Sequence, residues 1–324
     1  KENGFGRPAQ TVRERLEQVE ARQRVEDRDL ELRDLKVSFH GGVMTVWVPE
    51  DEVLNGKMLI TSNAASQLSG MVLPGHFFKG LRVLAGADAE GQALATNVWA
   101  KFASFAPSLE LKTRTVMMKI GSETHRVVRA AVSRSYAPYS NLSFVDSMLK
   151  NAGPYARMPV VSCTLTDSGI RIRFVAMENE MWALGNLSNS ALEMEPLPMV
   201  EAWNSEVGRR KVGFRAGMFK MKKNIALPHW NRATDATWVH RGDSSRIRLG
   251  VNYGFTGLFT SAQEVVAAYN KAMTLEIPNI EEWLMKHIQD EVGQKVQDSI
   301  KAALNKEFIP VQGSVLGSVV AAIC

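Results

Sequence analysis

The apolar positions of the chain alternate with a period of two in three places, and each place predicts a β-hairpin. The first covers residues 37 to 48, with Gly41 and Gly42 at its turn. The second covers residues 110 to 133, with a turn at Gly121, and the third covers residues 160 to 177. Short turns of this kind join antiparallel strands, so the predicted sheet is mainly antiparallel.

The third hairpin has two chemically different faces. Ile170, Ile172 and Phe174 point to one side of the strand, and Arg171 and Arg173 point to the other. We therefore expect one side to pack in a core and the other side to be basic.

A helical period appears between and around these hairpins. Residues 61 to 73, 77 to 84 and 92 to 106 have helical apolar spacing, and the first of them follows a Ser or Thr cap. The stretch from 8 to 35 is dense in charge with sparse apolar positions, which predicts a solvated surface helix or an arm that reaches a neighbouring subunit. A helical pattern resumes at residue 261.

The C-terminal part carries apolar residues at a spacing of four, from Ile280 through Leu284, Ile288 and onward to Phe308. Such a stripe drifts around a straight helix, so we expect a break, with Gly293 as the candidate. The small apolar tail from 311 to 324 is predicted to pack on the protein or on another subunit.

These patterns predict an α+β fold, with a mainly antiparallel sheet built from hairpins and flanked by helices. Three regions follow: a charged helical arm at 1–36, an α+β core domain at 37–260, and a helical region with an apolar tail at 261–324.

The composition is that of an ordinary globular protein, with a net charge of only +5. Two cysteines, Cys163 and Cys324, exclude a disulfide framework, which favours a reducing compartment. No apolar run reaches the roughly 18 to 20 residues of a membrane span, and no signal peptide is evident. We therefore expect a cytoplasmic protein, with no membrane partner.

The common catalytic motifs are absent, so neither a catalytic residue nor a cofactor is predicted, and an enzyme is the less favoured interpretation. The stretch from Gly86 to Gly91 has the spacing of a phosphate-binding loop, but Gln92 replaces its Lys. No metal is predicted, although His229 and His240 share a polar region with Asp235 and Asp243. A carboxylate nuclease stays open on the acidic residues Asp167, Glu178, Glu180, Asp235 and Asp243.

Basic residues are concentrated in three blocks. The 15 residues from Arg209 to Lys223 hold seven cations and no acid. A second block holds Lys112, Arg114, Lys119, Arg126, Arg129 and Arg134, and a third holds Arg232, Arg241, Arg246 and Arg248. Lys and Arg bind phosphates with release of counterions, and Tyr136, Tyr139, Trp203 and Trp230 lie nearby as candidates to stack on bases.

The blocks predict a nucleic-acid-binding site. Its candidate residues are Arg114, Arg126, Arg129, Arg134, Tyr136, Arg171, Arg173, Arg209, Arg210, Lys211, Arg215, Lys220, Lys222, Lys223 and Trp230. The alternative is that the cations solvate an exposed sheet face and that the aromatic residues belong to the core.

Two segments of the chain are similar to sequence stretches of one known family. Residues 125 to 141, HRVVRAAVSRSYAPYSN, are similar to its "vRAvlS-x-x-Y-x-p-x-x-N" stretch, which falls on Arg129, Ala130, Val132, Ser133, Tyr136, Pro138 and Asn141. Residues 204 to 224 are similar to its "N-S-x-x-G … G-x-f-x-x-C-x-N-G" stretch, which falls on Asn204, Ser205, Gly208, Gly217, Phe219 and Asn224.

The segment from Thr61 to Leu73 also resembles the family's "LT-x-x-A-x-x-qL" element. These three stretches resemble a family found in phages and plasmids, domain of unknown function nine hundred thirty-two. The resemblance spans about residues 35 to 260. Three positions depart from the pattern: Ser140 replaces the usual Asp, and Lys222 and Ile225 replace Cys and Gly.

The resemblance implies a setting in mobile elements, beside recombination genes, and hence the cytoplasm of a bacterial host cell. Together with the basic blocks it points to an oligomeric protein that binds and anneals single-stranded DNA in homologous recombination, broadly like the RecT and Red-beta kind. The expected partners are single-stranded DNA and further copies of the chain. The main alternative is a phage virion or assembly protein, and a third is a host-defence or anti-restriction effector.

Overall fold

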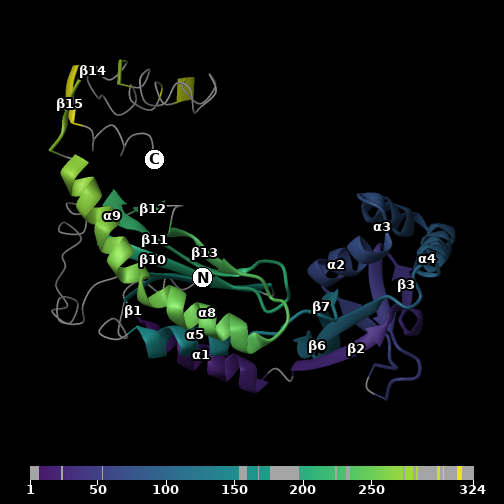
Figure 1. Ribbon diagram of the computed structural model, residues 1–324. Coiled ribbons are helices and arrows are strands. Elements are labelled where there is room, and N and C mark those ends of the chain that lie inside the picture. The colour runs from purple at the N-terminus through teal and green to yellow at the C-terminus, as the bar shows by residue number, and fades with distance from the viewer. Residues whose placement is uncertain are drawn as a thin grey trace. The chain divides into compact units, whose positions relative to one another are not determined.

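The computed structural model describes residues 7–22, 25–52, 54–152, 159–166, 168–175, 197–222, 225–230, 234–272, 274–279, 282–283, 298–299, 302 and 312–315. The chain forms two compact units (Figure 1). Unit 1 lies within residues 1–173, 202–213 and 236–255, and unit 2 within 174–201, 214–235 and 256–324.

The first sheet belongs to unit 1 and has the strand order β2-β6-β7-β5-β4-β3. Its strands are β2 (Val25–Glu31), β3 (Lys36–His40), β4 (Val43–Trp47), β5 (Met58–Ile60), β6 (Glu110–Ile120) and β7 (Glu123–Ser133). Its neighbours pair antiparallel except β5 and β7, which are parallel.

The hairpins predicted at 37–48 and 110–133 are confirmed as β3–β4 and β6–β7. Gly41 and Gly42 have φ values of 53° and 75°, the left-handed conformations that a two-residue hairpin turn needs at both positions. Gly121 has φ 64° at the second turn. Glycine adopts these values without a Cβ penalty, so the turns were readable from the sequence.

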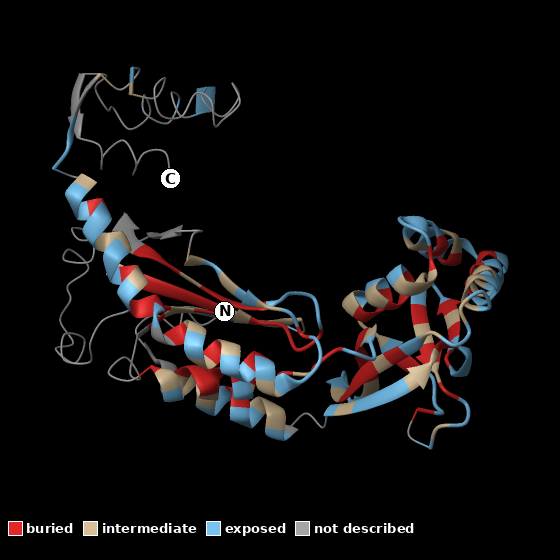
Figure 2. Cartoon of the chain, viewed as in Figure 1, coloured by how far each residue is buried: buried red, intermediate tan, exposed pale blue. Residues whose placement is uncertain are grey.

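Three helices complete this part of the fold: α2 (Ser62–Val72), α3 (Phe77–Ala87) and α4 (Ala89–Ala103). They match the three predicted helices, and the Thr61 and Asp88 side chains cap α2 and α4 by accepting hydrogen bonds from backbone N–H groups. Buried side chains of the helices and strands, such as Leu68, Trp99 and Phe39, form one core. Figure 2 shows this burial on the strands, with exposed residues on α3 and α4.

The second sheet has the order β1-β8-β9-β10-β11-β12, with β13 beside β11. Its strands are β1 (Arg7–Pro8), β8 (Pro159–Thr166), β9 (Gly169–Val175), β10 (Leu197–Asn204), β11 (Val212–Lys222), β12 (Ile225–Trp230) and β13 (Ala236–Trp238). Strands β14 (Glu276–Asn279) and β15 (Gln312–Val315) form a separate antiparallel pair.

The predicted faces of β9 are confirmed. Ile170, Ile172 and Phe174 are buried, whereas Arg171 and Arg173 are partly exposed. The α+β fold class with mainly antiparallel sheets is confirmed as well.

The helices α1 (Ala9–Arg22), α5 (Asn141–Asn151) and α8 (Ser244–Thr256) lie side by side in unit 1 (Figure 1). Arg13 of α1 donates to Asp146 of α5 at 2.6 Å, and Asn151 of α5 donates to Asn252 of α8 at 2.9 Å. Helix α9 (Leu258–Ala272) covers the helical pattern expected from residue 261. Helices α5 and α8 were not predicted.

The single charged helix predicted from 8 to 35 is wrong beyond Arg22. Residues Val25–Glu31 form β2, because this charged stretch pairs with β6 and places Asp27 opposite Arg114. Leu16 of α1 is buried, so this helix packs within its own chain at that position. The cross-strand ion pairs turn a polar segment, which looks helical by composition, into an edge strand.

The apolar stripe predicted from Ile280 to Phe308, with its break at Gly293, lies largely outside the described residues. The side chains of the predicted apolar tail from 311 to 324 lie outside them too. Among the helices that are described, none has the length and apolar character to span a bilayer.

Candidate nucleic-acid interface

The segment between β10 and β11, residues 205 to 211, changes from buried to exposed at Gly208. Asn204 to Val207 are buried, and Gly208 to Lys211 are exposed. Gly208 has φ +69°, and a Cβ there would lie 3.0 Å from Val132 and 3.1 Å from Tyr136. Both the backbone conformation and the close approach require glycine at this point. We call residues 205 to 211 the basic loop.

Ser205 anchors the start of the basic loop through three hydrogen bonds. Its hydroxyl donates to the Ser168 carbonyl at 2.7 Å and accepts from the Arg209 N–H at 3.0 Å. Its carbonyl accepts from the Tyr136 hydroxyl at 2.9 Å. Tyr136 is itself buried and stacked on His240, and this burial raises the pKa of its hydroxyl far above the ordinary value.

Asn204 joins the basic loop to the start of α5. Its side-chain nitrogen donates to the Tyr139 carbonyl at 2.9 Å and to the Asn141 side-chain oxygen at 3.0 Å. The Asn204 oxygen Oδ1 is buried and accepts no hydrogen bond from the described residues. A buried acceptor without a donor raises the free energy of the folded protein. A hydrogen-bond donor that bound to this oxygen would remove that cost.

Glu206 is the acidic centre of the same network. Its carboxylate accepts a hydrogen bond from the Asn141 N–H and lies 3.6 Å from Arg129 Nη1. Arg114 donates to the Glu206 carbonyl at 2.9 Å and binds both oxygens of Asp27, at 2.8 and 3.2 Å. The two arginines are thus paired inside the protein.

Gln67 of α2 holds the basic loop from another side. Its nitrogen donates to the Val207 carbonyl at 2.6 Å, and its oxygen accepts from the Ala131 N–H of β7 at 3.2 Å. Three stretches that are far apart in the sequence therefore meet here, through Gln67, through Arg129 to Asn141, and through Asn204 to Gly208. Their residues support the basic loop.

The structure separates the fifteen predicted site residues into groups. Arg114, Arg129 and Tyr136 are buried, with 8%, 8% and 7% of their surfaces exposed. Arg126, Arg134 and Arg215 each pair with a glutamate of their own chain: Glu26 at 3.5 Å, Glu110, and Glu201 at 2.6 Å. These six side chains already have partners within the protein. The five arginines are therefore poorly placed to bind phosphates in this conformation, and Tyr136, stacked on His240, is poorly placed to stack on a base.

Four of the remaining predictions fall where side chains lie outside the described residues. Lys220 and Lys222 belong to β11 and Trp230 to β12 by their backbones alone, and Lys223 lies outside altogether. Their part in a site stays a prediction.

The last five predicted residues, Arg171, Arg173, Arg209, Arg210 and Lys211, are exposed or partly exposed. Three of them, Arg209, Arg210 and Lys211, follow one another at the tip of the basic loop. Within the described part of the chain, none of these three side chains forms an ion pair with an acid. They are the cations that the structure leaves most available to an anionic partner.

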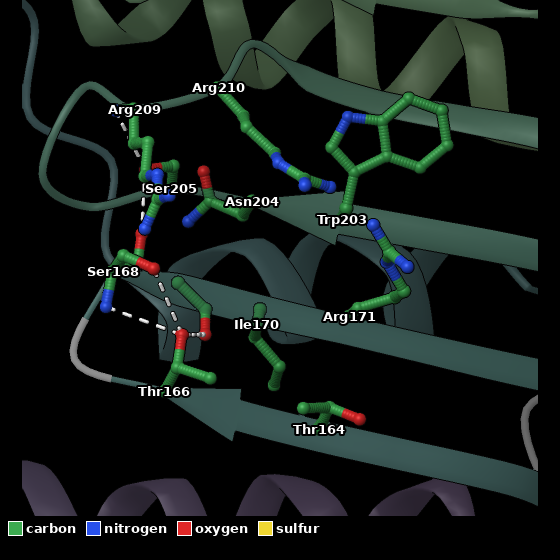
Figure 3. Close-up of a pocket in the computed structure, with 11 residues that line it drawn as sticks. Thr164, Thr166, Ser168, Ile170, Arg171, Trp203, Asn204, Ser205, Arg209 and Arg210 are labelled. Carbon is green, nitrogen blue, oxygen red and sulfur yellow. Dashed lines mark hydrogen bonds between the residues drawn. The ribbon is translucent and has the colours of Figure 1, made fainter.

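Two pockets adjoin the tip of the basic loop and share Arg210. The first, of about 250 Å³, lies between β8, β9, β10 and the loop, and is shown in Figure 3. Its cations are Arg171, Arg209 and Arg210, and Trp203 forms part of its wall. We call it the Trp203 pocket.

The second pocket, of about 470 Å³, is more open and includes Arg210, Lys211, Arg241, Ser133 and Ser135. No acidic side chain occurs among the described residues that line either pocket. Arg241 is brought there by a bridge between its backbone and that of Tyr136. The sequence placed Arg241 in a basic block but gave no signal that it would join the basic loop.

A third cavity, of about 440 Å³, has a different electrostatic character. Arg114 and Arg129 line it together with Glu20 and Glu206, so its opposite charges balance. Burial raises the pKa of the Glu20 carboxyl, and the charge of Glu206 adds to that rise. This balance does not favour an anionic ligand.

The metal and nuclease alternatives gain no support from the described residues, among which no three His, Cys, Asp or Glu side chains are grouped as metal ligands would be. His240 Nδ1 lies 3.1 Å from the Ala137 carbonyl, and burial lowers the pKa of the imidazole. The carboxylate of Asp243 accepts hydrogen bonds from Ser245. The side chain of His229 lies outside the described residues.

Comparisons with known proteins found no relative. No family model matches the chain, and neither a curated protein nor a solved structure matches it. Among the described residues, the feature that best indicates a function is the basic loop, which is held by hydrogen bonds between two pockets lined with cations.

Proposed function

We propose that this chain binds single-stranded nucleic acid through the basic loop, and that several copies act together to anneal DNA strands in the homologous recombination of a phage or mobile element. The observation that supports this proposal best is the tip of the loop, where Arg209, Arg210 and Lys211 are exposed and form no ion pair with an acid among the described residues. Arg171 and Arg241 line the adjoining pockets and extend the basic surface. Phosphates are the natural partners of such a surface.

The buried network holds the basic loop in one conformation, which favours binding. Hydrogen bonds from Gln67 and Tyr136 hold its backbone carbonyls, and the Asn141 N–H holds the Glu206 side chain, before any ligand arrives. A loop that is already ordered loses little conformational entropy when it binds, so more of the interaction energy appears as affinity. Annealing itself needs no bond cleavage, because base pairing supplies the energy.

Binding to a labelled single-stranded oligonucleotide, measured against salt concentration, tests the proposal. The double variant Arg209→Ala with Lys211→Ala should reduce the slope of log affinity against log salt by roughly 0.7 per lost phosphate contact. A matched control, Lys36→Ala with Lys79→Ala, removes the same charge from exposed positions in β3 and α3.

The control should leave the slope unchanged. If the loop variant keeps the affinity and slope of the unaltered protein, the proposed phosphate contacts are wrong. If both variants lower the slope equally, the protein binds through its general charge and not through the basic loop.

One feature favours the second candidate, a virion or assembly component. Phe77 and Phe105 are 44% and 69% exposed, and both contact the ring of Phe102, with centroids 5.5 and 6.2 Å away. Val83 and Leu94 of α3 and α4 are exposed as well. Exposed apolar clusters of this kind mark protein contacts. If this candidate holds, substitution of Phe105 by Ser should lower self-association, whereas the double variant of the basic loop should keep the affinity and salt slope of the unaltered protein.

A further inference from the structure

We propose that the Trp203 pocket receives one base of the bound strand, with the base edge facing Asn204 and the adjacent phosphates on Arg209 and Arg210. This inference rests on the proposed function and adds a base-binding subsite to it. The pocket is lined by three cations, one aromatic residue and a buried acceptor, which together match the parts of a nucleotide.

The orientation of the Asn204 amide is determined by its partners. Its nitrogen faces the Tyr139 carbonyl at 2.9 Å, and a carbonyl oxygen can only accept a hydrogen bond. The amide nitrogen must therefore lie on that side, and Oδ1 must lie on the other. Figure 3 shows the Asn204 oxygen turned toward the Arg209–Arg210 segment of the pocket.

The Asn204 side chain offers a hydrogen-bond acceptor to a ligand in the pocket. The residue is 2% exposed, it lines the pocket, and its Oδ1 has no partner among the described residues. A ligand that brings an N–H group satisfies this atom, whereas phosphate and sugar ring oxygens only accept hydrogen bonds. The acceptor thus distinguishes a base from the rest of the strand.

The cations around the pocket are placed to bind the phosphates next to the base. Arg171 and Arg210 extend toward Trp203 from two different elements, and Arg209 stands at the opposite end (Figure 3). Trp203 lies against Gly213, where a Cβ would come within 2.4 Å of the indole ring. Glycine at position 213 lets the ring lie close to the strand, which fixes the wall of the pocket.

The pocket volume of about 250 Å³ lies below the roughly 300 to 1,000 Å³ of sites for drug-sized ligands. This space suits one base and not a longer segment. Every nucleobase has at least one N–H on its pairing edge, so one acceptor binds any of the four bases. The subsite would hold one base per chain without sequence preference and leave its neighbours free to pair.

The test compares two labelled strands of about 12 nucleotides by fluorescence anisotropy: oligo(dT), and an abasic strand with the same phosphates. The unaltered protein should bind oligo(dT) at least about fivefold more tightly than the abasic strand. A third strand, built from N3-methylthymidine, has no N–H on its base and should bind more weakly than oligo(dT).

Two matched variants locate the subsite. Thr164→Phe fills the pocket from β8, and Ser162→Phe places the same side chain two residues earlier on the same strand, outside the pocket. Thr164→Phe should lower the affinity for oligo(dT) to that for the abasic strand and leave abasic binding unchanged. Ser162→Phe should preserve the difference, and thermal melting checks that both variants fold.

The outcomes separate the subsite from the proposed function. Equal binding of oligo(dT) and the abasic strand by the unaltered protein overturns the subsite and leaves phosphate binding intact. A preference for oligo(dT) over the abasic strand that survives Thr164→Phe overturns this location. Binding of the N3-methyl strand as tight as that of oligo(dT) overturns the role of Asn204. Failure to bind any strand overturns the proposed function and the subsite with it.

Discussion

Glu206 shows, at the scale of one residue, that the burial of an ion pair affects stability more than the number of charges does. Its carboxylate and its carbonyl bind partners on β6, β7 and α5, among them the buried Arg114 and Arg129. Removal of one partner from a buried ionic network leaves the others without compensation, which costs much more than the loss of an exposed pair.

We expect Glu206→Ala to lower the free energy of unfolding by about 3 to 5 kcal/mol. Glu110→Ala, which breaks the exposed pair with Arg134, should cost less than about 1 kcal/mol. Chemical denaturation of the two variants measures the difference. Equal, small costs would show that the network around Glu206 does not stabilise the fold.

His240 gives the protein a pH dependence of defined sign. Burial lowers the pKa of its imidazole in the folded state, with a smaller contribution from Arg114. Between the lowered pKa of the folded state and the unfolded-state pKa of about 6.5, the imidazole is protonated in the unfolded chain and neutral in the folded chain. Stability contributed by this group is therefore present at neutral pH and is lost as the pH falls below about 6.5.

The prediction compares denaturation at pH 7.5 and pH 5.5. The unaltered protein should lose more stability between these values than the variant His240→Gln, which has no imidazole to protonate. Glu20 has a raised pKa and contributes with the opposite sign, but it is present in both proteins and cancels in the comparison. An identical pH dependence of the two proteins would contradict the assignment.

At the scale of the element, the basic loop depends on one backbone conformation. Gly208→Ala adds a Cβ at φ +69° and within 3.1 Å of Val132 and Tyr136, which is both a backbone and a packing conflict. Gly121→Ala is the matched control, because Gly121 has φ +64° with nothing within 4 Å of the added atom.

We expect Gly121→Ala to cost about 1 kcal/mol, the backbone penalty alone, and Gly208→Ala to cost more by about 1 to 3 kcal/mol. Gly208→Ala should also weaken oligonucleotide binding, since it displaces Arg209 to Lys211. Thermal melting and anisotropy measure the two effects. Normal affinity in a Gly208→Ala protein that is folded but destabilised would show that the loop conformation is unimportant for binding.

At the scale of the whole molecule, the proposed function requires association. Three consecutive cations and one base subsite contact only a few nucleotides, so a long strand needs many copies to hold it extended. We expect static light scattering at micromolar concentration to show assemblies that grow with the length of the added single strand. A monomer both with and without DNA would contradict the annealing proposal.

The local patterns of the sequence determined much of the fold. Alternation of apolar residues with glycine turns defined the hairpins β3–β4 and β6–β7, since strand faces and turn conformations depend on neighbours in sequence. Helices such as α2 were predictable for the same reason, because their apolar spacing and their cap also depend on neighbours in sequence. Strand β2 did not, because its charged residues form a strand only when β6 supplies partners such as Arg114.

The sequence predicted that the candidate site is rich in cations, but it did not predict which residues form the site. The sequence by itself indicated that the segment from Arg209 onward is rich in cations, and that Arg171 lies on the polar face of a strand. Only the tertiary structure decided that Arg114 and Arg129 are buried beside Glu206, while Arg241 joins the basic loop. The physical reason is that burial and pairing depend on residues far apart in sequence, here 67 to 207 and 141 to 204, which local pattern does not report.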